Sequence, residues 1–275
     1  MVKKDLCLIV LSHHSYSDIW DLTLNSYKKF FSANADLFIT SDYIKLDENL
    51  SNLLNKTNFN HLYYPKELSW SDSLSYIMKN YIKGKYKNVI FSFDDLVLLE
   101  EVDKLKIESL PDVLGSKMDY LVLNNKHRTI YTDFIYLFNR KKDYFKLTNK
   151  DTYRGSLVFS AWDVPFFYNL ISSNELTNQN PWQYEQLINT VVNSNRTFSV
   201  NRGLFKAANV IVKGSVLIEE KEKAEKRIEI KYTNNRPILK GLDEIKFNTY
   251  RKLFSIVRYL FPPSLFSRIR KILEK

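Results

Sequence analysis

The first 95 residues alternate short apolar runs with amphipathic stretches, and this alternation constrains the fold more than any other feature of the sequence. Four runs have the length and composition of buried strands: residues 5–12, 35–42, 61–65 and 88–95. Two stretches carry apolar residues at helical spacing: 18–31, with Asp18 as the expected N-cap, and 69–86, which closes near Gly84. Strands that alternate with helices predict an α/β fold, in which a mostly parallel, Rossmann-like sheet is flanked by helices.

The next part of the chain continues this pattern less regularly. Strands are expected at 118–125, 132–139 and 208–218, the last with a turn at Lys213-Gly214. Helices are expected at 164–173 and 181–194. We therefore expect one compact domain over residues 1–218.

The C-terminal part has a different composition. Residues 219–231, EEKEKAEKRIEIK, carry acidic and basic side chains in equal number, which is typical of a solvated face or a linker. We expect a charged linker over 219–245. Residues 246–275 hold two apolar stripes at helical spacing, separated by Pro262-Pro263, with Lys and Arg on the opposite faces. This pattern predicts a C-terminal extension of two basic amphipathic helices.

Composition limits the classes of function. The formal net charge of +10 indicates acidic partners, among which nucleic acid, an anionic membrane and a phosphorylated small molecule all qualify. The one cysteine, Cys7, excludes an internal disulfide and a Cys-based zinc site. The chain has six glycines and no Gly-rich dinucleotide or P-loop motif, which argues against a Rossmann dinucleotide-binding site and a P-loop. No segment has the ~20 apolar residues of a membrane span, so a cytosolic protein is expected.

Two adjacent carboxylates, Asp94 and Asp95, end the fourth predicted strand. In a parallel α/β sheet, ligands bind outside the carboxyl ends of the strands. Two close carboxylates in a partly dry cleft repel each other unless a cation or hydrogen-bond donors compensate. A hard divalent cation that carries a diphosphate would compensate, and a plain turn into the next element is the alternative interpretation.

A second stretch carries a resemblance to a known family. Residues 153–188 contain SL, AWDV and NPWQYE in that order, and NPWQYE begins 85 residues after FDD ends at Asp95. Together these motifs resemble a bacterial glycosyltransferase with the GT-A fold, of the kind that builds lipopolysaccharide O-antigen or capsule. The resemblance covers about residues 5–215, and it implies a GT-A-like catalytic domain over the compact part of the chain.

The resemblance implies roles for the acidic residues. Asp94 and Asp95 match the element that holds a divalent metal, Mn²⁺ or Mg²⁺, and the sugar nucleotide, although its usual spacing is D-x-D. Glu185 matches the acidic position of the PW motif, which implies a catalytic base. The late histidine that often completes the metal site has no counterpart, because His127 is the last histidine of the chain. Metal dependence is therefore expected to be weak.

Further residues are candidates for binding the two substrates. Donor-binding candidates follow the predicted strands or open a helix: Ser12, His13, His14, Asp42 and Asp72. Acceptor-binding candidates lie in the AWDV and NPWQYE motifs: Trp162, Asp163 and Trp182. Basic candidates for the diphosphate are Lys126, His127, Arg128 and Lys213. Each of these residues can also be explained without a role in binding. The tryptophans can pack in the core, the acids can cap a helix or lie in its first turn, and the others can be ordinary loop residues.

The expected function is transfer of a sugar from a nucleotide diphosphate to a glycan or lipid-linked glycan, with inversion if Glu185 is the base. One-signed charge on the amphipathic residues 246–275 predicts peripheral binding to the inner face of the cell membrane. Three alternatives stay open. They are a metal-dependent phosphoryl-transfer enzyme or nuclease built on the Asp pair, a basic nucleic-acid-binding protein and a non-catalytic scaffold. Nucleic acid is disfavoured because the basic residues gather in one terminal segment.

Overall fold

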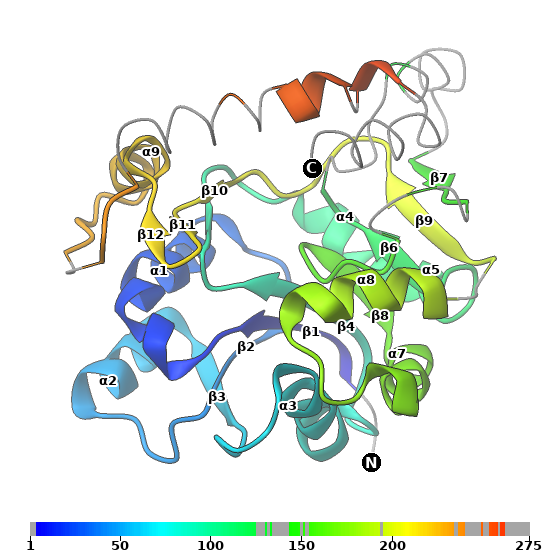
Figure 1. Ribbon diagram of the computed structural model, residues 1–275, viewed down its shortest axis with the longest axis horizontal. Coiled ribbons are helices and arrows are strands. Elements are labelled where there is room, and N and C mark those ends of the chain that lie inside the picture. The colour runs from blue at the N-terminus through cyan, green and yellow to red at the C-terminus, as the bar shows by residue number, and fades with distance from the viewer. Residues whose placement is uncertain are drawn as a thin grey trace.

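The computed structural model describes residues 4–124, 130, 133, 143–148, 151, 154–192, 195–233, 236–239, 249, 253–257 and 259–261. Its centre is a mixed sheet with helices on both faces (Figure 1). The strand order is β3-β2-β1-β4-β8-β6-β9-β7. These strands are β1 (Lys4–Leu11), β2 (Asp36–Ser41), β3 (Phe59–Tyr63), β4 (Tyr86–Phe93), β6 (Tyr120–Val122), β7 (Tyr144–Lys146), β8 (Ser160–Asp163) and β9 (Thr197–Val200).

The sheet is mostly parallel. Strands β3, β2, β1 and β4 form an unbroken parallel run, and β6 pairs with β9 in parallel. Strand β8 is antiparallel to both of its neighbours, β4 and β6, and β7 is antiparallel to β9. This arrangement confirms the expected α/β fold with a large, mostly parallel sheet flanked by helices.

The helices cover the sheet and the connections between strands. They are η1 (His14–Ile19), α1 (Trp20–Phe30), α2 (Glu48–Thr57), α3 (Trp70–Ile77), η2 (Met78–Ile82), α4 (Lys104–Glu108), α5 (Leu110–Val113), α7 (Val164–Ile171), η4 (Asn174–Leu176), α8 (Pro181–Val191) and α9 (Ile218–Ile228). Two small ladders complete the fold: β10 (Ala207–Asn209) pairs with β5 (Leu96–Leu98), and β11 (Ile211–Val212) pairs with β12 (Ser215–Val216).

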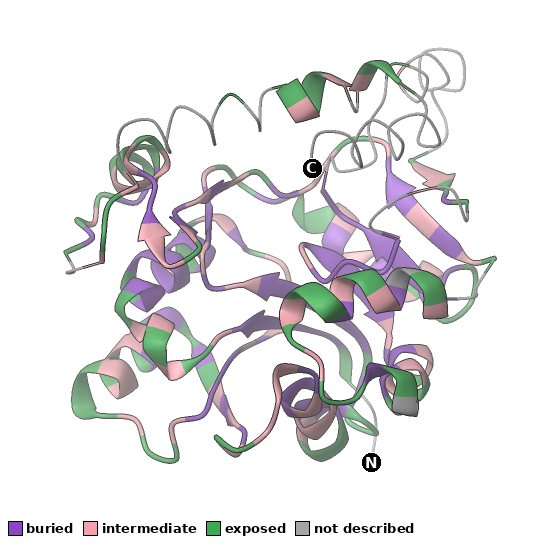
Figure 2. Ribbon diagram, in the orientation of Figure 1, coloured by how far each residue is buried: buried purple, intermediate pink, exposed green. Residues whose placement is uncertain are grey.

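Burial on both faces explains why β1 reads as a continuous apolar run. Leu8 and Val10 face the core formed with α1, α2 and α9. Cys7 and Ile9 alternate with them and face the core formed with α3, α7 and α8. Successive side chains of a strand point to opposite faces, so a central strand covered on both sides carries apolar residues at every position. Figure 2 shows the same central strands as buried.

Most of the predicted elements coincide with an element of the structure, but several elements were not predicted, which are α2, α4, α5, α9, β5, β7, β8 and β9. Helix α2 was not predicted, although Asp47 caps it by accepting a hydrogen bond from the Leu50 N–H at 2.8 Å. Strand β8 was not predicted either, because SAWD is too short to show a period. Asp18 lies inside η1 rather than capping α1, and its carboxylate pairs with distant residues described below. Nearly all of the strand expected at 132–139 falls outside the described residues.

The expected linker contains a packed helix. Helix α9 begins at Ile218 and runs through the balanced charges, and it buries Ala224 and Ile228 against the α1 side of the core. The linker expectation is therefore wrong for this stretch. The many charged residues of this stretch obscured its two buried apolar residues, Ala224 and Ile228, which lie one turn apart and pack the helix against the core. Within the described residues, no helix combines the length and the apolar character that crossing a membrane requires.

Candidate functional site

Three parallel strands end at one edge of the sheet and bring their following residues together. Ser12 follows β1, Asp42 follows β2 and Asp94 follows β4. The backbone of this edge is continuous, because the Ser12 N–H donates to Thr40 Oγ1 at 2.9 Å and the Asp94 N–H donates to the Leu11 carbonyl at 3.3 Å. The topology thus brings Ser12, Asp42 and Asp94 together at one edge of the sheet.

Asp94 is held from several sides in a buried position, with 6% of its surface exposed. The Ser12 hydroxyl donates a short hydrogen bond to its Oδ2, and Trp20 Nε1 donates to that same Ser12 Oγ at 2.8 Å. Thr23 Oγ1 donates to the Asp94 carbonyl at 2.5 Å. Burial, followed by the neighbouring charge of Asp95, raises the pKa of Asp94 well above its usual value. The Ser12 hydroxyl is thus engaged by both Asp94 and Trp20.

Asp95 is half-buried and forms the turn into β5. Burial raises its pKa to about 6. The Val210 N–H donates to its carbonyl at 3.0 Å, and the Asn209 amide nitrogen, oriented toward the carboxylate, donates to Oδ2 at 3.2 Å. Sequence reasoning missed Asn209, because only the pairing of β10 with β5 brings it to this turn.

The Asp pair fits a divalent cation. Burial raises the pKa of both carboxyls, and the charge of Asp95 raises the pKa of Asp94 further. A bound cation would remove this cost of ionising the pair. Asp94 already accepts the Ser12 hydrogen bond, whereas Asp95 is less buried. Asp95 is accordingly the better ligand for a metal ion and Asp94 the residue that orients the turn.

The raised pKa values predict how stability depends on pH without metal. Between about pH 4 and pH 6 the unfolded chain ionises Asp95 while the folded protein keeps it protonated, so the free energy of unfolding falls as pH rises. An Asp95→Asn variant removes this loss. In EDTA we expect it to match the wild type near pH 4 and to exceed it by about 2–3 kcal/mol at pH 7, at about 1.4 kcal/mol per pKa unit.

Thermal and urea unfolding at pH 4, 5, 6 and 7 measure this difference. Asp112→Asn, at an exposed position of α5, is the matched control and should show no pH-dependent gain. A gap between wild type and Asp95→Asn that stays constant from pH 4 to pH 7 would contradict the predicted ionisation.

A second polar cluster lies beside the first. His14 Nδ1 is 2.6 Å from Asp42 Oδ2, and the His14 N–H donates to Asp42 Oδ1 at 2.9 Å. His13 Nε2 is 3.4 Å from the same Asp42 Oδ2. Burial favours a higher pKa for Asp42, but the His14 hydrogen bonds outweigh it and the pKa of Asp42 is lowered. Burial lowers the pKa of His13.

Arg236 brings a positive charge to this edge from the far end of the chain. Its guanidinium donates to Asp18 Oδ2 at 2.8 Å and to Asp18 Oδ1 at 2.7 Å, and lies 4.4 Å from the Tyr16 ring centre. Its charge also opposes the rise in the pKa of Asp94. No sequence signal pointed to Arg236, because it lies in the expected linker and reaches the site only through tertiary packing.

Glu185 lies on α8, whose start is fixed by a capping box between Asn180 and Gln183. Its Oε1 accepts a hydrogen bond from Ser156 Oγ at 2.8 Å, and the side chain is half-buried. The Trp70 indole lies between this helix and Phe93, the residue that precedes Asp94. The Trp70 ring stacks on Phe93, at 6.5 Å between centroids, and meets Tyr184 edge-on at 5.1 Å.

The remaining candidates near α8 divide into packed and exposed positions. Asp72 accepts from Ser69 Oγ at 2.6 Å and from the Asn178 N–H at 3.3 Å, so it joins the start of α3 to the loop before α8. Trp182 is 70% exposed on the first turn of α8 and offers a free ring face. Trp70 is half-buried between α3 and α8 and lines a small cavity with Ser12 and Thr40.

Two acceptor candidates do not suit the proposed role. Trp162 is fully buried in the core, and its Nε1 donates to Ser160 Oγ, so it has no face for a sugar ring. Asp163 pairs in register with Asn88, near the start of β4, and therefore lies at the sheet edge opposite Asp94. Its carboxylate caps α7 through the Phe166 N–H at 2.9 Å. Antiparallel β8 reverses this segment, which the sequence did not reveal.

The basic candidates contribute little to the described site. Lys213 is exposed at the tip of the β11–β12 hairpin, in the left-handed region with a φ of 51°. Lys126, His127 and Arg128 lie outside the described residues. Arg236 is thus the basic side chain that the described structure places beside the Asp pair.

Comparisons with known proteins give no family for this chain. No protein-family model matches the sequence, and no curated protein matches it. Among solved structures, residues 1–349 of TarS from S. aureus are 14% identical with a TM-score of 0.47, over 73% of this chain and 59% of that one. A mannosyltransferase from Pyrobaculum calidifontis, in complex with GDP-Man and Mn²⁺, is 6% identical with a TM-score of 0.47, over 78% and 59%.

Other structural neighbours have a different activity. A 4-diphosphocytidyl-2C-methyl-D-erythritol synthase from Anaerococcus prevotii is 12% identical with a TM-score of 0.47, over 81% of this chain and 96% of that one. The chain spans less than two thirds of the TarS and mannosyltransferase chains. At these identities and TM-scores, the neighbours do not transfer an activity to this protein, and the functional argument rests on the site itself.

Proposed function

We propose that this protein is a metal-assisted glycosyltransferase that moves a sugar from a nucleoside-diphosphate donor to a hydroxyl of a glycan or lipid-linked glycan. The observation that carries the proposal is the adjacent pair of buried Asp94 and half-buried Asp95 at the carboxyl edge of a parallel run of strands. Such an edge is where open α/β sheets bind ligands, and an unneutralised carboxylate pair there calls for a cation.

Each side chain of the candidate site has a distinct role in the proposed transfer reaction. A divalent cation bound at Asp95 would neutralise the departing diphosphate. Asp94, fixed by Ser12, orients the turn, and Arg236 adds positive charge on the side of the β1 loop. Glu185 takes the proton of the attacking hydroxyl, and attack on the face opposite the leaving group inverts the anomeric centre.

His13, His14 and Asp42 line the same edge beyond Ser12, and we place the nucleotide end of the donor there. Asp42 is engaged by His14 through both carboxylate oxygens, so the outward-facing imidazoles are the closer contacts for a ligand. On the acceptor side, the exposed ring of Trp182 supplies a stacking face for a sugar.

A thermal-shift panel of nucleotide sugars, with and without Mn²⁺, tests the proposal. We expect one donor to raise the melting temperature of the wild type, more strongly with Mn²⁺, and to leave Asp95→Ala unchanged, since ligands stabilise only the state that binds them. Stabilisation by nucleoside triphosphates but no sugar nucleotide would favour a nucleotidyltransferase. Hydrolysis of DNA or phosphomonoesters would favour the phosphoryl-transfer alternative, and either result would overturn the proposal.

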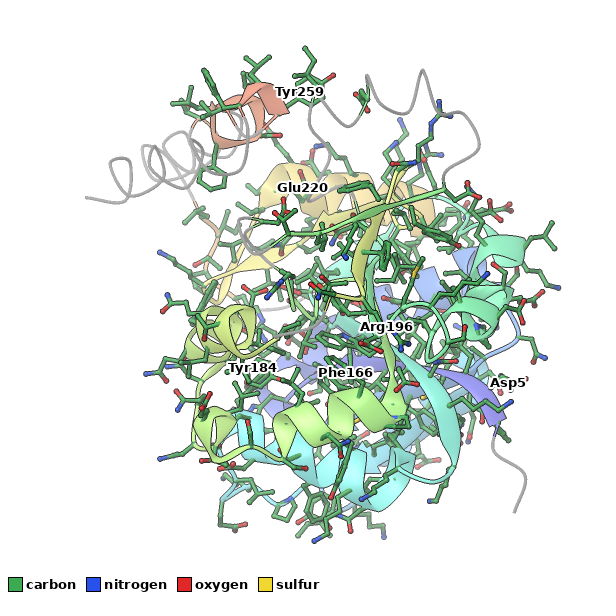
Figure 3. All side chains as sticks on the ribbon, turned by 90° about the vertical axis from the view of Figure 1, so that its right-hand side faces the viewer. Asp5, Phe166, Tyr184, Arg196, Glu220 and Tyr259 are labelled. Carbon is green, nitrogen blue, oxygen red and sulfur yellow. The ribbon has the colours of Figure 1, made fainter. Side chains whose placement is uncertain are left out.

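The C-terminal segment supports a lipid-linked acceptor at the inner face of the cell membrane, as in surface-polysaccharide synthesis. Its described residues expose a helical stripe of Leu253, Ile256 and Leu260, at 46%, 55% and 49%. Figures 1 and 3 place this helix, which carries Tyr259, at the end of the molecule that also holds α9 and Glu220. An apolar stripe in a segment whose sequence is rich in Lys and Arg suits an anionic lipid surface.

Deleting residues 246–275 should move the protein from the membrane to the soluble fraction and leave donor hydrolysis intact, because the proposed donor site lies within residues 12–236. Fractionation of cells that express each form measures the first effect, and hydrolysis of the donor found above measures the second. Retention of the truncated protein on membranes would exclude the segment as the anchor.

A further inference from the structure

A cluster of two histidines and one carboxylate lies beside the Asp pair and has the geometry of a metal site of its own. One ligand atom from each of His13, His14 and Asp42 lies within 4.8 Å of the other two. The histidines come from the turn after β1 and the aspartate from the turn after β2, so two adjacent parallel strands hold the cluster in place. We propose that these three residues bind a divalent transition-metal ion of the zinc type.

The separations between ligand atoms suit such an ion. A cation with bonds of about 2.0–2.2 Å keeps neighbouring ligand atoms roughly 3.0–3.5 Å apart. His13 Nε2 and Asp42 Oδ2 already stand 3.4 Å apart. His14 Nδ1 and Asp42 Oδ2 stand 2.6 Å apart, the distance of a shared proton. Exchange of that proton for the metal, with a small side-chain rotation, completes the site.

The surroundings orient the ligands as in known metal centres, where a ligating histidine donates its second ring N–H to a neighbour. His13 Nδ1 accepts the Ser15 backbone N–H at 3.3 Å and lies 3.0 Å from Ser15 Oγ. Metal binding at Nε2 requires the tautomer that carries its proton on Nδ1, and Ser15 Oγ is the neighbour that would accept this N–H in place of the capping contact. The His14 backbone N–H holds the other Asp42 oxygen at 2.9 Å. The Asp42 side chain is only 2% exposed, whereas His13 is 46% exposed, so the open side of the site faces solvent.

The chemistry of the ligands distinguishes this site from the Asp pair. Imidazole nitrogen is the ligand that Zn²⁺, Cu²⁺ and Ni²⁺ prefer, whereas Mg²⁺ and Mn²⁺ prefer oxygen alone. Three protein ligands with an open side are typical of zinc sites that keep a position for water or a ligand. The inference does not depend on the proposed transferase activity, since it concerns the binding of the ion alone.

The site can be tested by calorimetry, in which the full-length protein is first stripped of metal with a chelator and then titrated with Zn²⁺. The visible absorption of bound Co²⁺ reports the geometry of the site. We expect one saturable equivalent. His13→Ala and Asp42→Asn should each weaken binding by ~100-fold, the upper end of what the loss of even a second-shell partner costs a zinc site. Asp95→Asn and His61→Gln should bind as the wild type does, because His61 pairs with Ser41 outside the cluster.

His13 is exposed, so His13→Ala tests the site even if Asp42→Asn fails to fold. Absence of saturable Zn²⁺ binding, or unchanged affinity in His13→Ala, would overturn the proposal and leave a hydrogen-bonded cluster. Loss of Zn²⁺ binding in Asp95→Asn would assign the ion to the carboxylate pair instead.

Discussion

Replacing Glu185 by glutamine is expected to lower sugar transfer to the acceptor by about 10²–10⁴-fold, the usual contribution of a general base. Glutamine keeps the shape of the side chain and can still accept the hydrogen bond from Ser156 Oγ, so α8 should keep its position. Donor binding should be unchanged, because the Asp pair that holds the diphosphate is intact. The measurement is the transfer rate at saturating donor, together with donor affinity from thermal shift.

Glu175→Gln is the matched control for this change. It makes the same substitution at an exposed residue of η4, six residues before α8 begins at Pro181, and should leave the transfer rate unaltered. Transfer by Glu185→Gln at the wild-type rate would remove Glu185 from the mechanism and with it the argument for inversion. Equal loss of donor binding and of transfer would indicate a structural role instead.

Replacing Trp20 by alanine is expected to destabilise the fold by about 3–5 kcal/mol, since it empties a large, fully buried site. It also removes the N–H that donates to Ser12 Oγ at 2.8 Å and so orients the Ser12 hydroxyl toward Asp94. A loss of this size is a large fraction of the stability of a typical domain. Urea unfolding measures it directly.

The two conservative variants Trp20→Phe and Trp162→Phe separate packing from orientation of the site. Both tryptophans are fully buried and both donate through Nε1 to a serine, but Trp162 donates to Ser160, within β8. We expect similar losses of stability from the two variants and a weaker metal-dependent thermal shift with donor only in Trp20→Phe. An equal effect of both variants on donor binding would contradict the role assigned to the Trp20–Ser12–Asp94 chain.

Local patterns in the sequence were enough to predict the parallel half of the sheet and the edge at which Asp94 and Asp95 lie. Period-2 and period-3.6 patterns depend only on neighbouring residues, so they identified the four strands of the parallel run and the helices α1, α3, α7 and α8. They also placed Asp94 and Asp95 at the end of β4, because two adjacent carboxylates interrupt the apolar run that marks a buried strand. The start of α8 was equally readable, since Asn180, Pro181 and Gln183 carry the capping signal within one turn.

The groups that meet at that edge from distant parts of the chain could be identified from the folded structure but not from local patterns. Antiparallel pairing of β8 with β4 put Asp163 at the opposite edge and Trp162 in the core, although both stood in a motif that resembled a binding site. Pairing of β10 with β5 brought Asn209 to Asp95, and the chain beyond α9 brought Arg236 to Asp18. Such contacts depend on strand direction and long-range packing, which no local period encodes.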